Sequence, residues 1–423
     1  MDLEKRLNTF IFPEAVGAGC LGDDVEKFVS FEIKRHPGKH QFCSDTTFGD
    51  IILQKTTGLR FNLPVFVKTR NRSEFPPRAE ADAMFYNEIF FYTKIVPILR
   101  RYDEFNILST SFPEFVCGKK TSGQNPEDDV IVLKDLRQRG FRPCKQRHFD
   151  ENHLSLVLDR LGKFHGLSLL WQMDDPALFQ EVTARIKLIS EAKLWAALGG
   201  IQSKEVFRQC MFRGVDPLRE EPKYWNQLTD LCASFEDADE RMDALADASG
   251  PLTVLAHGDF HASNVMFKYA ADGKPIEVAF FDFGTIKLCS PAIDLCHFLL
   301  VSVSPQMKQD RWSELLYQYY GALSHQIGDD LWKPSFETFD LDLRRRGVHA
   351  YYVIAAILPA VMSIKEGTEV PRPPTSIKKD QEKLKEEMEV YMRNMKELGG
   401  TFVTDLLAEI VRHMIDKKFF FKH

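Results

Sequence analysis

Two polar motifs at the ends of a predicted β-hairpin constrain this 423-residue chain more than any other feature. The first, HGDFHASN, occupies residues 257–264, and the second, FFDFGT, occupies residues 280–285. Between them lie two strand-like stretches joined by AADGKPI, in which Asp272 and Gly273 form a strong hairpin-turn signal. The pattern therefore predicts that the two motifs meet at the open end of one hairpin.

Three oxygen-bearing side chains converge at that end of the hairpin. A turn centred on Asp272 and Gly273 brings Asn264 beside Asp282, and Asp259 precedes them in the loop. A carboxylate and an amide oxygen suit a hard cation such as Mg²⁺, whereas a separate carboxylate is free to orient a hydroxyl nucleophile and take its proton. Phosphoryl transfer needs this division of roles, so all three are predicted catalytic residues. The plainer alternative is that Asp259 and Asn264 only build a turn.

A second predicted pair lies upstream. Lys68 ends the strand-like run VFVK, and Glu88 falls on the apolar stripe of a predicted helix over residues 79–102. A carboxylate in an apolar stripe is costly unless it is paired. We therefore expect Glu88 to pair with Lys68, with Glu80 as the fallback.

The organisation of the chain favours an α+β fold in two lobes. Its length exceeds one ordinary domain of about 100–200 residues. The first third contains β-like runs, and the pattern after about residue 135 is mainly helical; the β-like runs are residues 45–54, 64–70, 112–118 and 130–136. We expect a small sheet-rich nucleotide-binding lobe over 1–134 and a larger helical lobe, with the catalytic loop and acceptor site, over 135–423.

Composition narrows the range of partners and compartments. The net charge of −6 argues against nucleic acid or an anionic membrane surface as the main partner. The most apolar stretch, residues 348–364, contains a His and a Pro and is short for a membrane span, which favours a buried helix. The first residues show no signal-peptide pattern, and the eight cysteines form no C-x-x-C. We expect a cytoplasmic protein with reduced cysteines.

The spacing D-x-x-x-x-N followed by D-F-G resembles the catalytic pattern of kinases, and HGD is the form seen in choline and aminoglycoside kinases. More narrowly, the run from VLAHGDF to CHFLL resembles the ecdysteroid kinase-like family. VIVLKDLRQRGF, LDRLGKFHGLSLL and GKHQFCSDTTFGD fit the same family, over about residues 20–365. The resemblance implies a two-lobed protein-kinase-like fold, ATP and Mg²⁺ as cofactors, and phosphorylation of a hydroxylated small molecule, with ecdysteroids as the name-giving substrates.

The resemblance also implies roles for individual residues. Lys68 would contact the α/β-phosphates, and Glu88 would hold it in place. Ser44 would lie in the phosphate-binding region, and Asp135 would lie in the inter-lobe segment that binds the adenine edge through its backbone. Asp294 would brace the catalytic loop, although it could equally be an ordinary acid at a helix N-terminus.

Three positions depart from the family pattern. Lys39 and His40 follow Gly38 where an Asn two residues after the Gly is usual, which leaves the phosphate contact open. Lys134 replaces the usual Glu before Asp135. His261 stands where an aromatic residue, often Trp, is common, so it is a candidate contact to the acceptor.

Rival interpretations remain at this point. A choline- or aminoglycoside-type kinase with a polar acceptor, and a catalytically weak pseudokinase-like module, fit the same motifs. The G-x-G-x-x-G over residues 17–22 is followed by a strand-like run and is interpreted as a helix-end turn. His257, Asp259 and His261 also suit a metallohydrolase cluster, although the chain lacks a G-N-H-[DE] segment.

The acceptor is expected to be largely apolar, with an ecdysteroid as the leading candidate. The run 348–364 has no Asp or Glu and carries Tyr351, Tyr352 and Met362. Apolar pockets with a few polar groups suit sterol-like ligands. Such a run nevertheless packs the core more often than it lines a pocket.

Overall fold

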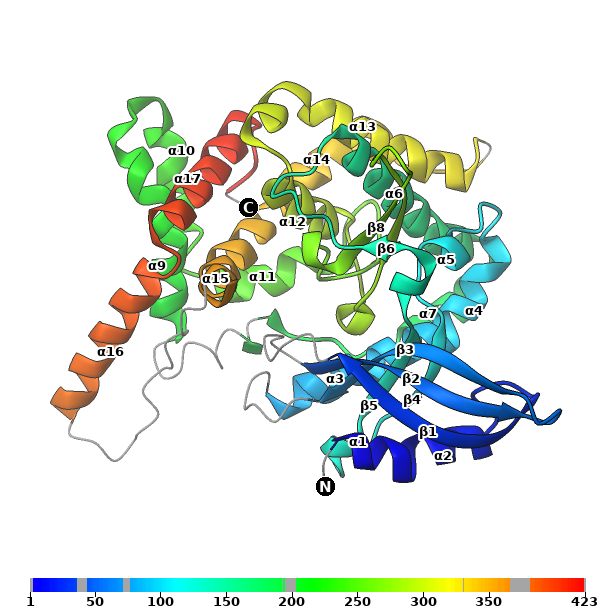
Figure 1. Ribbon diagram of the computed structural model, residues 1–423. Helices are drawn as coiled ribbons and strands as arrows, with labels where there is room; N and C mark the ends of the chain where they lie inside the picture. Colours follow the sequence, from blue (N-terminus) through cyan, green and yellow to red (C-terminus); the bar gives the residue numbers. More distant parts are fainter. Residues whose placement is uncertain are drawn as a thin grey trace. The chain divides into compact units, whose positions relative to one another are not determined.

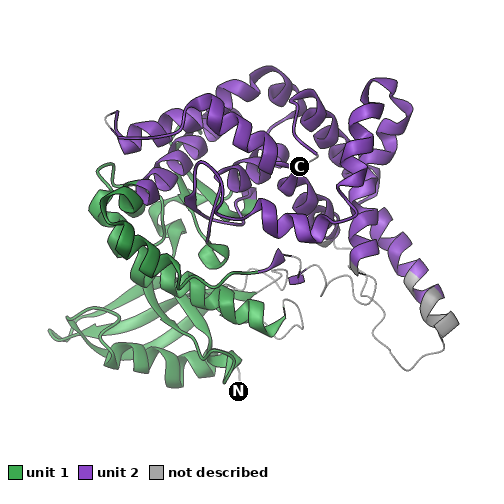
Figure 2. Ribbon diagram, turned by 180° about the vertical axis from the view of Figure 1, so that it is seen from behind, with its two compact units in different colours: residues 1–145, 170–189, 263–286 green, residues 146–169, 190–262, 287–423 purple. Residues whose placement is uncertain are grey.

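The computed structural model describes residues 3–35, 44–70, 77–191, 193–194, 203–329, 331–365 and 381–421. The chain divides into two compact units, which Figure 2 shows in different colours. Unit 1 comprises Met1–Lys145, Leu170–Ile189 and Ser263–Ile286. Unit 2 comprises Gln146–Leu169, Ser190–Ala262 and Lys287–His423.

A five-stranded antiparallel sheet in the order β1-β2-β3-β5-β4 forms the main part of unit 1 (Figure 1). The four predicted β-like runs are all strands of this sheet. Its members are β1 (Val25–Arg35), β2 (Ser44–Lys55), β3 (Arg60–Arg70), β4 (Phe115–Lys119) and β5 (Val130–Lys134).

Alternation along β3 separates the two faces of this sheet. Val65 and Val67 join the apolar core under the short helices α1 (Leu3–Arg6) and α2 (Phe12–Gly17), which pack along β1. Because successive side chains of a strand point to opposite faces, Lys68 faces the other side. That face is the one met by α3 (Arg78–Phe90).

Two local predictions in unit 1 hold. The helix expected over residues 79–102 begins as α3, continues through a wider turn at Phe91–Ile95, and ends with α4 (Val96–Leu99) and a tight turn at Arg100–Tyr102. The Gly-rich stretch at residues 17–22 is a helix-end turn, because α2 stops at Gly17.

The predicted hairpin is confirmed. β8 (Val265–Tyr269) pairs antiparallel with β9 (Pro275–Phe280), and β6 (Phe141–Arg142) completes a three-stranded sheet. Gly273 adopts φ of 86°, the left-handed conformation that a side chain disfavours, and its N–H donates to Ala270 O at 3.0 Å. The turn therefore fixes the register of both strands.

Unit 2 is mostly helical and contains one short antiparallel pair, β7 (Val254–Ala256) with β10 (Lys287–Cys289). An antiparallel sheet followed by a mainly helical remainder confirms the predicted α+β class. The division of roles at residue 134 stays a prediction. The helices placed wholly or largely in unit 2 are α6 (Glu151–Asp174), α9 (Ser203–Val215), α10 (Trp225–Ala233), α11 (Ala238–Leu245), α12 (Ala292–Ser302), α13 (Pro305–Ile327), α14 (Phe336–Arg346), α15 (Val348–Lys365), α16 (Gln381–Glu397) and α17 (Gly400–Asp416).

The apolar run at residues 348–364 lies in α15 and is a buried helix, as predicted. Tyr351 and Tyr352 are fully buried, and their hydroxyls donate to Met211 O at 2.5 Å and to Ser234 Oγ at 2.8 Å. Both tyrosines therefore belong to the core of unit 2. Among the described helices, none is long and apolar enough to cross a membrane.

Candidate active site

Lys68 lies between two carboxylates of unit 1. Its Nζ donates to Glu88 Oε2 at 2.7 Å and to Asp282 Oδ1 at 2.6 Å. The side chains of Lys68 and Glu88 are 8% and 2% exposed, whereas that of Asp282 is 42% exposed. The predicted Lys68–Glu88 pair is thus present, and the acid after β9 shares its lysine.

The backbone at Asp282 is in a conformation that only a few non-glycine residues adopt. Its φ and ψ are 71° and 64°, in the left-handed region. Such conformations cost about 1–3 kcal/mol and persist where the surroundings enforce them. Asp282 is therefore held in a sharp turn between β9 and the next residues.

The residues after Asp282 are clamped onto α3. Asn87 Nδ2 donates to Gly284 O at 3.1 Å, and a Cβ at Gly284 would meet Met84 Cβ and O at 3.2 Å. Phe283 stacks on Phe91 with ring centroids 4.0 Å apart. The close approach and the stacking fix the turn that carries Asp282.

Asn264 reaches the same place through the hairpin register. Val265 is the partner of Phe280, and the N–H of Phe281 donates to Asn264 O at 3.2 Å. Asn264 therefore lies opposite position 281, as predicted from the turn, and next in register to Asp282. Its side chain is buried.

The charge of this cluster favours a cation. With Glu88 ionised, one lysine and two carboxylates carry a net charge of −1; burial raises the pKa of Glu88, and the charge of Lys68 opposes that rise. Burial alone would lower the pKa of Lys68, but the charges of Asp282 and Glu88 outweigh it and raise the pKa well above its usual value. Lys68 is thus always charged, and the oxygens of Asp282 and Asn264 are the donor types that Mg²⁺ prefers.

The loop that contains Asp259 belongs to unit 2 and is held by Asp294 of α12. The N–H of His257 donates to Asp294 Oδ2 at 2.7 Å, and the N–H of Gly258 donates to Asp294 Oδ1 at 2.9 Å. Asp294 is fully buried; burial would raise its pKa, but His165 and the backbone donors hold the pKa below its usual value. Asp294 therefore does brace the loop just before Asp259.

A buried chain of side chains supports Asp294 from behind. His165 on α6 contacts Asp294 Oδ2 through Nε2 at 3.2 Å and Tyr319 Oη through Nδ1 at 2.7 Å. All three side chains are fully buried. The sequence reasoning missed His165 and Tyr319; the one available signal was a histidine inside the apolar helix pattern LGKFHGLSLL.

Asp259 itself lies among imidazoles. His261 Nε2 is 3.5 Å from Asp259 Oδ2, and the N–H of Asp259 donates to His257 Nδ1 at 3.3 Å. Burial would raise the pKa of Asp259, but His261 and His297 hold it well below its usual value. Asp259 is therefore a carboxylate near neutral pH.

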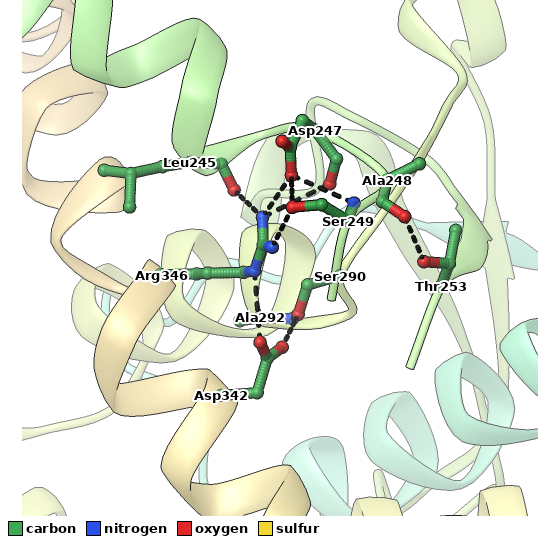
Figure 3. Close-up of polar contacts among 9 residues, drawn as sticks. All are labelled: Leu245, Asp247, Ala248, Ser249, Thr253, Ser290, Ala292, Asp342 and Arg346. Carbon is green, nitrogen blue, oxygen red and sulfur yellow. Dashed lines mark hydrogen bonds and ion pairs between the residues drawn. The ribbon is translucent and has the colours of Figure 1, made fainter. Parts of the chain in front are cut away.

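Arg346 and Asp342 of α14 form hydrogen bonds to the segment before β7 and to the residue after β10 (Figure 3). Arg346 Nη1 donates to Leu245 O at 2.7 Å and to Asp247 Oδ1 at 2.9 Å, and Nη2 donates to Ser249 Oγ at 3.0 Å.

Asp342 joins the two sides of this arrangement. Its Oδ1 accepts from Arg346 Nε at 3.1 Å, and its Oδ2 accepts from Ser290 Oγ at 2.5 Å. Ser290 follows β10, and Ser249 precedes β7. Because β7 and β10 are antiparallel, with Val254 opposite Cys289, one buried ion pair holds both chains at the same end of this strand pair. The Asp259 loop follows β7 at the other end.

The remaining predicted nucleotide contacts are less distinctive. Ser44 is buried at the start of β2. The N–H of Asp135 donates to Pro64 O at 3.2 Å, and the Asp135 carboxylate accepts from Arg137 N, Nε and Nη2 at 2.7–3.0 Å. Asp135 therefore caps a turn, and contacts of Ser44 and Asp135 with a nucleotide stay predictions. Gly38, Lys39 and His40 lie outside the described residues.

A metallohydrolase needs a cluster of side chains that hold a metal ion. Within the part of the chain that the structure describes, no group of three or more His, Cys, Asp or Glu side chains is placed to hold a metal ion. His257 Nδ1 instead accepts a backbone hydrogen bond from Asp259.

Comparison with known proteins gives one family and several distant structures. Residues 40–329 match the model of the ecdysteroid kinase-like family. That match covers more than half of the chain and, with the sheet followed by helices, confirms the predicted kinase-like fold class. No curated protein matches the sequence.

Aminoglycoside phosphotransferases are among the solved structures that overlap with this chain. The GDP complex of wild-type aminoglycoside 2'-phosphotransferase-IIIa is 12% identical over 88% of this chain and 93% of that chain, with a TM-score of 0.40. The GDP complex of a mutant of that enzyme and the GDP and kanamycin complex of APH(2")-IIia are each 11% identical over 88% of this chain, with TM-scores of 0.39; they are covered over 92% and 94% of their lengths.

Proposed function

This chain belongs to the ecdysteroid kinase-like family, and from that premise we propose that it is an ATP-dependent phosphotransferase acting on a hydroxyl of a small molecule. The observation that carries the proposal is the buried Lys68 between Glu88 and the more exposed Asp282. A lysine held by a helix glutamate beside a metal-binding aspartate is the arrangement that phosphoryl transfer uses to hold ATP phosphates.

Lys68 binds the phosphates in this proposal, and Glu88 keeps its ammonium group in place. Asp282 and Asn264 hold Mg²⁺, which supplies charge neutralisation on the phosphates when it is bound. The buried Lys68–Glu88 pair fixes one side of the cluster, so only Asp282 and Asn264 need to present oxygens to the cation.

Asp259 orients the acceptor and receives its proton. The hydroxyl oxygen forms a bond to the γ-phosphorus while the bond from that phosphorus to the bridging oxygen breaks, and the bond pair leaves with ADP. The hydroxyl proton moves to Asp259, which is a carboxylate near neutral pH. Asp294 supports this role by holding the backbone of the two preceding residues.

The acceptor in this proposal is a largely apolar, hydroxylated small molecule, with an ecdysteroid as the leading candidate and His261 as a contact to its hydroxyl. Family membership supports this choice. Tyr351 and Tyr352 give it no support, because both are core residues.

The sheet-rich part up to residue 134 binds the nucleotide, and residues 135–423 supply the catalytic loop and the acceptor site. Six of the described cysteines form no disulfide bond, which suits a reducing compartment such as the cytoplasm; they are Cys20, Cys117, Cys210, Cys232, Cys289 and Cys296.

A panel of acceptors tests the function. Purified protein with Mg²⁺ and ATP is offered an ecdysteroid, choline, an aminoglycoside and a plant-type phenol glycoside, and phosphorylated product is detected by mass spectrometry. We expect a phosphorylated ecdysteroid. Turnover confined to choline or the aminoglycoside would replace the apolar acceptor with a polar one, and binding of Mg·ATP without any product would favour the pseudokinase alternative.

Calorimetry tests the metal site separately. Asp282→Ala should abolish Mg²⁺-dependent ATP binding, because it removes the carboxylate that holds the cation. Asp405→Ala, at an exposed position on α17, is the matched control and should bind Mg·ATP as the wild type does. Unchanged affinity in Asp282→Ala would refute the assignment.

A further inference from the structure

Helix α12 presents two side chains to the Asp259 loop. Asp294 and His297 are three residues apart, so they lie on the same face of the helix. Asp294 holds the backbone of the loop, and the ring of His297 lies 5.7 Å from the ring of His261 at an interplanar angle of 55°. His261 in turn lies against Asp259, with 3.5 Å between Nε2 and Oδ2.

We propose that Asp259 and His261 form a proton-accepting chain and that His297 is a positioning residue that holds the His261 ring beside the carboxylate. This inference rests on the proposed function, because it concerns the fate of the acceptor proton. Neither the family pattern, in which an aromatic residue is common at position 261, nor the kinase motif supplies such a chain.

The surroundings of His297 set its protonation. Besides Asp259, the groups that act on His297 are His261, Glu191 and His349. Burial, as the largest effect, lowers the pKa of His297 to about 4, so this ring is neutral at pH 7.

Glu191 does not compete for the proton of His261. Its carboxylate is paired with Lys287 at 2.5 Å and with His349 at 2.9 Å. The third imidazole next to Asp259, that of His257, uses Nδ1 to accept the Asp259 N–H. His261 is therefore the imidazole placed to share the proton of Asp259.

The proton step balances within this chain. As the acceptor oxygen bonds to phosphorus, its proton passes to Asp259, and ADP takes the electron pair of the bond that breaks. A carboxyl group, with an ordinary pKa of about 3.9, holds that proton less firmly than an imidazole, with an ordinary pKa of about 6.5. Asp259 therefore passes the proton to neutral His261 Nε2, 3.5 Å away, which restores the carboxylate. Imidazolium then releases the proton to water. Catalytic contacts are commonly longer before substrate binds, so a distance of 3.5 Å suits this role.

Nuclear magnetic resonance of imidazole-labelled protein tests the contact without any acceptor. The signal lost in His261→Gln should titrate in the wild type, and its midpoint should move to lower pH in Asp259→Asn, because the carboxylate favours imidazolium. The signal lost in His297→Phe belongs to His297. Its chemical shift should stay that of a neutral imidazole down to about pH 5. His297→Ala should weaken the coupling of His261 to Asp259, and His297→Phe, which keeps a ring, should retain it. An identical His261 midpoint in wild type and Asp259→Asn would overturn the chain.

The pH dependence of kcat, measured with Mg·ATP and the acceptor that the panel identifies, tests the proton transfer. Wild-type kcat should fall between about pH 8 and pH 5 as His261 becomes protonated. His261→Gln should lose that pH dependence and be slower at pH 8 by less than the roughly 10²–10⁴-fold expected for loss of the base itself. His325→Gln, at an exposed position on α13, is the control and should retain it.

The outcomes separate this inference from the function that it rests on. The same fall of kcat at low pH in wild type and in His261→Gln would overturn the proton chain. The proposed phosphotransferase function would be unaffected by that result. If His297→Ala has the same kcat as the wild type, and the same fall of kcat at low pH, then His297 has no positioning role. Absence of product from the wild type with every acceptor would overturn the function and the chain together, whatever the titration of His261.

Discussion

At the scale of single residues, Lys68 is held by two acids with different surroundings. Glu88 is buried with it, whereas Asp282 is partly exposed. Glu88 keeps the buried charge of Lys68 compensated, because breaking a buried ion pair leaves an unpaired charge. Glu88 therefore positions the lysine. Asp282 is more exposed, and we assign it to binding of a cation. The two carboxylates thus differ in role because they differ in burial.

A double-mutant cycle tests whether Lys68 and Glu88 act as one unit. Lys68→Met should strongly reduce kcat/KM, and adding Glu88→Gln should make it little worse, because residues in contact are not additive. The exposed pair Lys134–Glu114, with 2.6 Å between Nζ and Oε1, is the matched control. Its double mutant should behave nearly as the wild type. Additive losses for Lys68 and Glu88 would show that they work separately.

At the scale of elements, α14 and α17 fasten unit 2 through buried polar groups. Arg346 at the end of α14 binds the segment before β7, and Lys308 on α13 donates to Glu409 of α17 at 2.6 Å. His413 of α17 lies 4.4 Å, ring to ring, from Trp312. These contacts join helices that are distant in the sequence.

Arg346→Lys should destabilise the protein by about 1–3 kcal/mol, because a lysine cannot reach all the acceptors of a guanidinium and leaves buried ones unpaired. Arg344→Lys is the control on the same helix, since Arg344 pairs with Asp340 at a partly exposed position. Denaturant unfolding measures both. Equal stability of the two variants would contradict a stabilising role for the Arg346 contacts in Figure 3.

His413 should make the protein less stable in acid. Burial, and then the charges of Lys308 and Lys417, lower the pKa of His413 to about 3. The unfolded chain, with a pKa of about 6.5, binds the proton more readily, so stability falls as pH drops from about 6.5 toward 3, by up to about 1.4 kcal/mol per pH unit. His413→Phe should flatten that slope, and His325→Phe should not. A slope that persists in His413→Phe would show that other groups cause it.

At the scale of the whole molecule, the sequence predicted local geometry better than long-range contacts. The Asp272-Gly273 turn was enough to place Asn264 beside Asp282, because a hairpin turn fixes register. Glu88 was found because a carboxylate on an apolar helix face needs a partner.

Contacts between distant segments were not predictable in the same way. His165 and Tyr319 join α6 and α13, and Arg346 reaches residues about a hundred positions away. The left-handed backbone of Asp282 is also set by packing on α3 rather than by its own sequence. No local period or turn signal carries such information.

Binding of Mg·ATP should stabilise the folded protein as a whole. A ligand at 100 times its Kd adds about 2.7 kcal/mol to the free energy of unfolding, so Tm should rise with Mg·ATP concentration. Lys68→Met should remove most of this rise, and the control Lys134→Met should keep it. An equal rise in both variants would contradict a phosphate site at Lys68.

Transfer of the γ-phosphate by Asp259→Asn is the most direct test of the central claim. With labelled ATP, Mg²⁺ and the acceptor that the wild type uses, this variant should bind nucleotide with unchanged affinity and transfer the phosphoryl group about 10²–10⁴-fold more slowly. Transfer at the wild-type rate would contradict the account, because Asp259 would then be neither the base nor the residue that orients the acceptor.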